Sequence, residues 1–567
     1  MREKKQKNMK KDSILKRIIV VLILLLISIF VLIKAENYLR ESTSDQINLI
    51  INNRNVTSRL KNNIFIENGT VYLSMDDIEN FFDKYIYIED EINEIVTTYD
   101  KKIASIGFEA NKLTLNGSTK KIYAHAITRD DIIYLPISEM LDVYNIELDN
   151  IEEEKIVTID SLNKEQIKAY VESNLSVKWK EDFFSKTVDK VSKGDIVIEI
   201  SKEDNGWSKI RTENGKIGYI KTNKLTNYTQ VREDWETEKQ ITGKVNMFWD
   251  YFSKYVKPTD RTGQTIDGVN VVSPSFFYID EDGELQENVG EAGINYIEWA
   301  HSNGYKVWPM ISNADAGIDV TSSILNSYTK RQELIEKIVE KCALYEIDGI
   351  NVDFENIYEA DKDKFSRFVI ELVPRMQELG IVTSVDVTAP DGAPNWSMCY
   401  DRNIIGDVAD YLVFMAYDQY GTSSTEPGTT AGLNWVETSL KKIIEYDAVD
   451  PEKIILGIPF YTRQWTIGQD GTIKDRGVVS MINIKIPNNV EKQWDDTLKQ
   501  NYIEYTSGRN TIKMWIEDGE SIKAKVSLVT KYNLAGTSGW RKDMETSNVW
   551  SIIKEELSKE STGQTEE

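Results

Sequence analysis

The 567-residue sequence predicts an α/β protein: a (β/α)8 TIM barrel with a small α+β insertion, preceded by a transmembrane helix, a small α+β module and a small β-barrel. Three observations support this prediction. A basic segment is followed by an apolar run near the N-terminus, and short strand-like segments follow between residues 46 and 228. From residue 240 onward, eight short apolar runs alternate with helix-length segments. Such alternation is typical of parallel strands that are covered by helices.

The first 35 residues predict a membrane anchor. Residues 1–17, the expected cytoplasmic tail, contain eight lysines and arginines, and residues 18–35 are apolar apart from Ser28 and Lys34. A basic segment before an apolar run is typical of a signal anchor or a signal peptide. Because no A-x-A-like cleavage site follows, we expect a single-pass anchor in the cell membrane, with the N-terminus inside and the rest of the chain extracellular. Cleavage of the anchor stays an open alternative.

The composition excludes several classes of protein. With 41% hydrophobic and 28% charged residues, the chain has the material for folded cores. A net charge of −24 argues against nucleic-acid binding, which needs lysine and arginine to neutralise phosphates. The two cysteines, Cys342 and Cys399, and the two histidines, His125 and His301, do not cluster at metal-ligand spacing. This spacing argues against a zinc site, and a disulfide between the cysteines is possible but not required.

Residues 46–165 contain a weak internal repeat. A predicted hairpin followed by a short amphipathic helix occurs at residues 66–82 and again at residues 127–141. This pattern resembles the small α+β module at the N-terminus of copper amine oxidases. The resemblance covers the module alone and implies no copper site.

Residues 188–228 predict a second, smaller unit built from strands. Asn214 and Gly215 form a two-residue turn signal between strand-like runs. The order of its glycines and aromatic residues resembles bacterial SH3-like wall-binding modules, which implies possible binding of a wall peptide. Trp207 and Tyr219 have two interpretations, as core aromatics of a small barrel or as a peptide-binding face.

Eight apolar runs predict the barrel strands, within a domain expected over residues 240–556. The runs are 245–248, 269–273, 307–311, 349–354, 382–387, 411–416, 454–460 and 535–540. Helices are expected at 327–345, 361–379 and 434–446, and a small inserted subdomain at 466–510. Eight is the number of strands that closes such a barrel.

The fourth predicted strand carries the chemistry. Residues 348–355 read DGINVDFE, and side chains alternate along a strand, so Asn351, Asp353 and Glu355 share one face while the apolar residues share the other. Buried carboxylates are costly unless they are paired or used. Two acids at the carboxyl end of a barrel strand lie where barrel active sites are built. Neighbouring carboxylates raise each other's pKa, which keeps one available as a general acid.

The motif DGINVDFE resembles the signature strand of glycoside hydrolase family 18, the chitinase family, in which acids recur as D-x-x-D-x-D-x-E. The resemblance implies that Glu355 is the proton donor and that Asp353 orients the substrate's acetamido group. Asp348 matches the first acid and is assigned to substrate binding, although its opposite parity leaves a structural role open. Asn351, also assigned to substrate binding, replaces the second acid. This variant resembles spore and cell-wall N-acetylglucosaminidases, and it argues against a proton relay through Asn351.

Three later segments resemble other motifs of the same family. They are MAYD at residues 415–418, GIPFYTRQW at 457–465 with Thr462 in place of glycine, and GTSGW at 536–540. Strand three lacks the family's S-x-G-G pattern. The resemblance implies that Tyr417 hydrogen-bonds the N-acetyl group as a catalytic residue, and that a tryptophan forms the floor beneath the sugar. The implied substrate-binding residues are Met415, Asp418, Tyr461, Arg463 and Trp540.

The resemblance implies retaining, substrate-assisted hydrolysis, in which the substrate's own acetamido oxygen attacks the anomeric carbon. This mechanism implies no metal and no organic cofactor. The expected substrate is an N-acetylated glycan of the cell wall, with peptidoglycan favoured. Three alternatives stay open: a chitinase-type enzyme, a non-catalytic glycan-binding surface protein, and an enzyme whose N-terminal modules form the main binding surface while the barrel is auxiliary.

Overall fold

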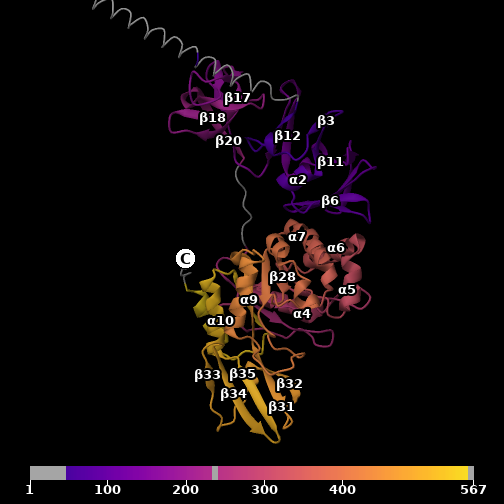
Figure 1. The fold of residues 1–567 in the computed structure, drawn as a ribbon, viewed down its shortest axis with the longest axis vertical. Helices are drawn as coiled ribbons and strands as arrows, with labels where there is room; N and C mark the ends of the chain where they lie inside the picture. Colours follow the sequence, from indigo (N-terminus) through magenta and orange to yellow (C-terminus); the bar gives the residue numbers. More distant parts are fainter. Residues whose placement is uncertain (1–27, 29–45, 233–239, 560–567) are drawn as a thin grey trace, which may run out of the picture. The chain divides into compact units, whose positions relative to one another are not determined.

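The computed structural model describes Ser28 and residues 46–232 and 240–559, which form two compact units (Figure 1). Of the described residues, one unit comprises 46–84, 108–111 and 121–232, and the other comprises 85–107, 112–120 and 240–559. The predicted tail and anchor lie outside the described residues, apart from Ser28. Among the residues that are described, no helix is long and apolar enough to cross a membrane.

The first unit contains the predicted hairpin-and-helix repeat. One copy is β3, β4 and α2, and the other is β10, β11 and α3. Ser74 begins α2 by accepting a hydrogen bond from the backbone N–H of Asp77. The bounds in this part are β1 (Asn48–Ile51), β2 (Arg54–Asn55), β3 (Phe65–Glu67), β4 (Thr70–Ser74), α2 (Met75–Phe81), β10 (Ile127–Arg129), β11 (Ile132–Pro136), α3 (Leu141–Tyr144), β12 (Ile146–Ile151) and β13 (Ile156–Ser161). Their two four-stranded sheets have the orders β12-β13-β1-β2 and β10-β11-β4-β3.

A seven-stranded antiparallel sheet follows in the same unit, in the order β16-β15-β19-β18-β17-β14-β20. Its strands are β14 (Gln166–Val171), β15 (Leu175–Lys178), β16 (Thr187–Val191), β17 (Ile196–Lys202), β18 (Trp207–Arg211), β19 (Ile217–Lys221) and β20 (Leu225–Arg232). The sheet extends beyond the predicted 188–228 because β14 pairs with both β17 and β20. Trp207 is buried and packs against Phe183, which favours its interpretation as a core residue. Likeness to an SH3 module stays a prediction.

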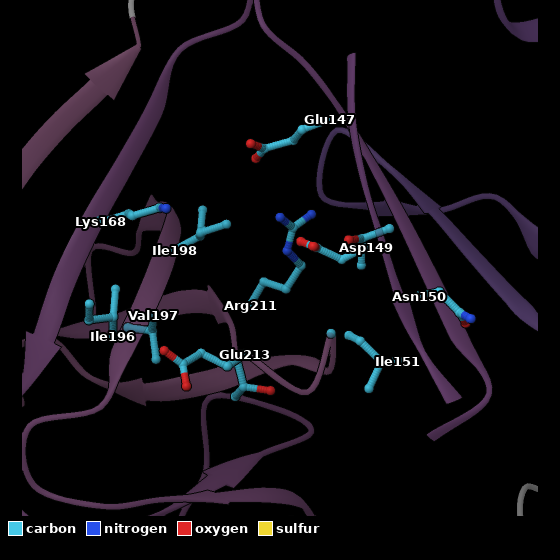
Figure 2. Close-up of a pocket in the computed structure, with 13 residues that line it drawn as sticks. Glu147, Asp149, Asn150, Ile151, Lys168, Ile196, Val197, Ile198, Arg211 and Glu213 are labelled. Atoms are coloured by element: carbon cyan, nitrogen blue, oxygen red, sulfur yellow. The ribbon is translucent and has the colours of Figure 1, made fainter. Parts of the chain in front are cut away.

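A cavity of about 410 Å³ lies in this unit, between β12 and the strands around β18 (Figure 2). Arg211 points into it from β18, but its guanidinium already binds both carboxylate oxygens of Asp160. Glu147, another lining residue, pairs with Arg232. Both ion pairs join the β12-β13-β1-β2 sheet to the seven-stranded sheet.

The expected module at 46–165 is divided between the two units. Its third sheet belongs with the second unit and consists of β5 (Tyr87–Glu89), β6 (Glu94–Tyr99), β7 (Lys102–Gly107), β8 (Lys112–Leu115) and β9 (Ser118–Lys121). The buried Arg331 of helix α6 (Tyr328–Leu344) holds this sheet in place. Its Nη2 lies 2.9 Å from Glu89 Oε2, and its Nε lies 2.9 Å from Glu371 Oε2 of helix α7 (Lys362–Glu378). Tyr87 also donates to Glu371, at 2.6 Å.

The second unit is a closed barrel of parallel strands. The strands are β21 (Val245–Asp250), β22 (Val271–Pro274), β25 (Lys306–Val307) with β26 (Met310–Ser312), β27 (Gly349–Asp353), β28 (Val382–Val387), β29 (Tyr411–Met415), β30 (Ile454–Pro459) and β36 (Gly536–Trp540). Pairing of β36 with both β30 and β21 closes the ring. The predicted third strand is interrupted at Trp308 and Pro309, since proline has no N–H for a ladder hydrogen bond. A hairpin of β23 (Phe277–Ile279) and β24 (Leu285–Glu287) joins the sheet beside β26.

Helices surround the barrel, and one large apolar core fills the space between them and the strands. The helices are α4 (Gly290–Ser302), α5 (Gly317–Leu325), α6 (Tyr328–Leu344), α7 (Lys362–Glu378), α8 (Arg402–Val408), α9 (Leu433–Glu445), α10 (Gly519–Lys531) and α11 (Val549–Leu557). A second apolar cluster, which includes Trp249 and Met415, lies inside the barrel. Most of its members lie on alternating strand positions, as expected for side chains that point inward.

The inserted subdomain is larger than the predicted 466–510. It is a five-stranded antiparallel sheet of β31 (Tyr461–Ile467), β32 (Ile473–Ser480), β33 (Gln493–Asp495), β34 (Gln500–Ser507) and β35 (Asn510–Ile516). Its first strand begins two residues after β30 ends. The sequence pattern could not separate the two strands because their apolar residues run together.

Candidate active site

Asp353 ends β27 and Glu355 follows it, at the carboxyl end of the barrel strands. Both side chains line a cavity of about 530 Å³. Aromatic residues form much of the remaining wall; they are Tyr251, Phe252, Tyr255, Phe277, Tyr278, Trp396 and Trp540. An open cavity with aromatic walls and two acids suits a sugar, whose ring faces are apolar and whose edges are polar.

Hydrogen bonds with Asn313 hold the backbone of Glu355, and the carboxyl group of Glu355 has a pKa suited to a proton donor. Its N–H donates to Asn313 Oδ1 at 2.8 Å, and its carbonyl accepts from Asn313 Nδ2 at 2.9 Å. Burial raises the pKa of its carboxyl group to about 8, and the charges of Asp353 and Asp418 contribute to the rise. Glu355 is therefore protonated at neutral pH, as a general acid must be.

Asp353 has a carboxyl oxygen available for a ligand. Its Oδ1 is buried and has no hydrogen-bond partner among the described residues. Burial, and then the neighbouring Asp386, raise the pKa of this carboxyl group well above its usual value. A buried acceptor without a donor is costly, so Oδ1 is suited to receive an N–H from a bound molecule.

Asn351, predicted to bind substrate, is a structural residue of the barrel interior. It is fully buried, and its Oδ1 accepts from Trp249 Nε1 at 2.8 Å. Its Nδ2 donates to Ser384 Oγ at 3.0 Å and to Asp386 Oδ1 at 2.7 Å. Because these hydrogen-bonding groups are occupied, Asn351 can influence a substrate only through the residues that it contacts.

The assignment of Asp348 to substrate binding is wrong. Asp348 precedes β27, and five residues of extended strand place it about 16 Å from Asp353. Its carboxylate accepts from Lys306 Nζ at 2.7 Å, from the N–H of Val307 at 3.0 Å, and pairs with His301 Nε2 at 2.8 Å. The opposite strand parity of Asp348 was the signal for this structural role.

Asp418, Tyr461 and Arg463 form one connected group. Asp418 Oδ1 accepts from Tyr461 Oη at 2.7 Å and from Arg463 Nη2 at 2.8 Å. Arg463 is almost fully buried, whereas the side chain of Asp418 is 51% exposed. Tyr461 and Arg463 therefore hold Asp418 in place, and Asp418 is the member of the group that a ligand can reach.

Tyr417 and Trp540 lie around Trp249 on the inner side of the barrel. The ring of Trp249 meets Tyr417 edge-on at 6.4 Å and Trp540 edge-on at 5.8 Å, measured between centroids. The pKa of Tyr417 is raised well above its usual value by burial and by the nearby acids, so its hydroxyl stays a hydrogen-bond donor. Met415 is buried in the inner apolar cluster, against which Tyr417 and Trp540 also pack.

Sequence reasoning missed Asp386, which lies in β28 and is 1% exposed. The signal was an acid within an apolar run, on the same strand face as Ser384. No group of three or more histidine, cysteine, aspartate or glutamate side chains that could hold a metal ion occurs in the part of the chain that the structure describes. Cys342 and Cys399 are free thiols, both buried.

A closed (β/α)8 barrel that presents a protonated acid and a second carboxyl group in an aromatic cavity has the features that a glycosidase needs. The sequence profile of glycosyl hydrolases family 18 matches residues 244–545, more than half of the chain, and the protein belongs to this family. The profile of the copper amine oxidase N-terminal domain matches residues 50–159.

Two relatives illustrate the similarity. The uncharacterized glycosylase YvbX of Bacillus subtilis is 25% identical over 297 residues, which cover 50% of this chain and 84% of YvbX. The cortical fragment-lytic enzyme of Bacillus subtilis is 26% identical over 243 residues, 41% of this chain and 55% of that enzyme. Among solved structures, the spore cortex-lytic enzyme SleL of Bacillus megaterium gives a TM-score of 0.49 at 22% identity, over 59% of this chain and 77% of SleL.

Proposed function

We propose that this glycosidase is an N-acetylglucosaminidase that cleaves peptidoglycan with retention of configuration, by substrate-assisted catalysis. The observation that carries the proposal is the pair of acids at the carboxyl end of β27. Glu355 is protonated at neutral pH, and Asp353 offers a buried, unpartnered oxygen beside it. A buried carboxyl group with a strongly raised pKa is a poor nucleophile, which favours attack by the substrate's own acetamido oxygen.

Each residue then has a defined role. Asp353 Oδ1 accepts the acetamido N–H and holds the amide beside the anomeric carbon. The Tyr417 hydroxyl donates to the acetamido oxygen, and Glu355 gives its proton to the leaving glycosidic oxygen. Glu355 then takes a proton from the water that opens the cyclic intermediate, which restores the starting protonation state. Trp540 supports the apolar face of the sugar ring.

The choice of peptidoglycan rests on sequence and relatives together. Asn351 replaces an acid of the chitinase motif, and two similar proteins are named cortical fragment-lytic and spore cortex-lytic enzymes. The basic and apolar pattern of residues 1–35 supports attachment to the outer face of the cell membrane. We propose that the seven-stranded sheet module contributes wall binding, with a wall peptide as its ligand. Removal of external protein by protease treatment of intact cells tests the proposed location.

Digestion of purified peptidoglycan by the full chain in detergent tests the activity. The wild type is expected to release fragments with N-acetylglucosamine at the reducing end, identified by mass spectrometry, and Glu355→Gln is expected to release none. Glu359→Gln, which changes an exposed acid nearby, is the matched control and should match the wild type.

Substrate analogues separate the alternatives. An aryl N-acetylglucosaminide should be hydrolysed and the aryl glucoside, which lacks the acetamido group, should not. Turnover of both would contradict substrate assistance. Cleavage of chitin oligosaccharides without cleavage of peptidoglycan would favour the chitinase alternative, and tight wall binding without hydrolysis of any of these glycans would indicate a binding protein.

A further inference from the structure

Asp353 and Asp386 are neighbours across two adjacent strands. β27 and β28 are parallel, and Asn351 pairs with Ser384 and Val352 with Val385. If this register continues by one residue, Asp353 pairs with Asp386. Adjacent strands lie about 4.8 Å apart, and paired residues of a parallel sheet point to the same side. Both carboxyl groups therefore face the barrel interior, side by side.

Each of the two acids has one carboxyl oxygen that lacks a hydrogen-bond partner among the described residues. Asp386 Oδ1 accepts from Asn351 Nδ2, whereas Asp386 Oδ2 has no hydrogen-bond partner among the described residues. Asp353 Oδ1 also lacks one. Two buried carboxylates that both carry a charge would repel each other strongly, and one proton held between them removes the repulsion and satisfies both oxygens.

The other titratable groups that face the pair do not supply a countercharge. They are Glu355 just after β27, Tyr417 after β29, and Tyr400, whose hydroxyl donates to the carbonyl of Phe354 at 2.8 Å. Burial raises the pKa values of both tyrosines well above the usual value, so they remain neutral. Neutralisation has to come from a proton on the pair itself.

We propose that Asp353 and Asp386 share one proton in the resting enzyme, and that Asp386 is the positioning residue that retains this proton when Asp353 receives the substrate's acetamido N–H. The inference rests on the proposed substrate-assisted reaction. On binding, the proton moves fully to Asp386 Oδ2, and Asp353 becomes an anion that stabilises the positive charge developing on the acetamido nitrogen. After product release the proton returns to the shared position, so the pair neither gains nor loses a proton in a cycle.

The same arrangement gives a physical account of Asn351. Its amide donates to Asp386 Oδ1 and its carbonyl accepts from Trp249. These contacts leave Asp386 Oδ2 as the atom that takes the proton. The second acid of the catalytic pair is thus supplied by β28, and an amide on β27 aligns it.

Infrared spectroscopy tests the shared proton without any substrate. The Glu355→Gln background removes the protonated Glu355 from the spectrum. At pH 7 the difference between this variant and Glu355→Gln/Asp353→Asn/Asp386→Asn, in which neither aspartate can carry a proton, should contain one protonated carboxyl band, because the pair holds one proton. Glu346→Gln, an exposed acid, should give no such band. Absence of the band from the difference would overturn the shared proton.

A carboxyl exchange tests the positioning role through activity on an aryl N-acetylglucosaminide. Asp386→Asn should lower kcat by about 100-fold with a smaller effect on KM. The double variant Asn351→Asp/Asp386→Asn returns an acid to β27, where Trp249 Nε1 can donate to it, and should recover most of the lost kcat. Unchanged kcat in Asp386→Asn, or no recovery in a double variant that folds with wild-type thermal stability, would refute the role. If the wild type hydrolyses no N-acetylated glycan, the proposed function fails, and the infrared result still decides the shared proton.

Discussion

Replacing Glu355 by glutamine should make the stability of the barrel less dependent on pH. The pKa of this carboxyl group rises from an ordinary 4.5 to about 8 in the folded protein. Below pH 4.5 the group is protonated in both the folded and unfolded states, so its ionisation does not change the free energy of unfolding. Between pH 4.5 and 8 the unfolded chain ionises while the folded protein does not, so unfolding becomes progressively more favourable. At ~1.4 kcal/mol per pH unit, the loss above pH 8 approaches about 5 kcal/mol.

Calorimetric unfolding of the wild type and Glu355→Gln at several pH values measures this difference. The glutamine has no proton to lose, so the variant should gain stability relative to the wild type as pH rises from 4.5 to 8. A barrel of this size should show a difference in Tm that grows by about 5 to 10 °C over that range. Parallel Tm curves for the two proteins would refute the raised pKa, and with it the argument that Glu355 is a ready proton donor.

Three further predictions follow from the same contacts. The kcat/KM of the wild type should fall about tenfold per pH unit above pH 8, and Asp418→Asn should move this fall to lower pH in a pH–rate profile, because the charge of Asp418 helps to raise the pKa of Glu355. Arg463→Met should lower kcat/KM by about 10- to 100-fold, since Asp418 loses a charged hydrogen-bond donor; steady-state kinetics equal to wild type would contradict this. Arg331→Met should destabilise the second unit by about 3 to 5 kcal/mol in calorimetry, because the buried Glu371 loses its only cationic partner among the described residues. The double variant Arg331→Met/Glu371→Gln should be less destabilised than the single variant.

Sequence periodicity was sufficient for the barrel because each strand had to bury both faces. The run 382–387 coincides with β28, and the run 349–354 differs from β27 by one residue. Periodicity failed where two elements share one apolar run, as at the junction of β30 and β31. It also could not predict that β5 to β9 belong with the barrel, since a single buried arginine on α6 joins residues that are 242 positions apart in the sequence.

The active site shows the same limit at the level of single residues. Alternation along one strand was enough to bring Asp353 and Glu355 together and to question Asp348, because parity within a strand is a local property. The relation of Asp353 to Asp386 depends instead on the register between two strands, which a 17-residue helix and its loops separate in the sequence. In the sequence alone, Asn351 in place of the motif's second acid therefore suggests that a catalytic acid is missing. In the folded barrel, the neighbouring strand supplies a carboxyl group at the same depth, and Asn351 is the residue that orients it.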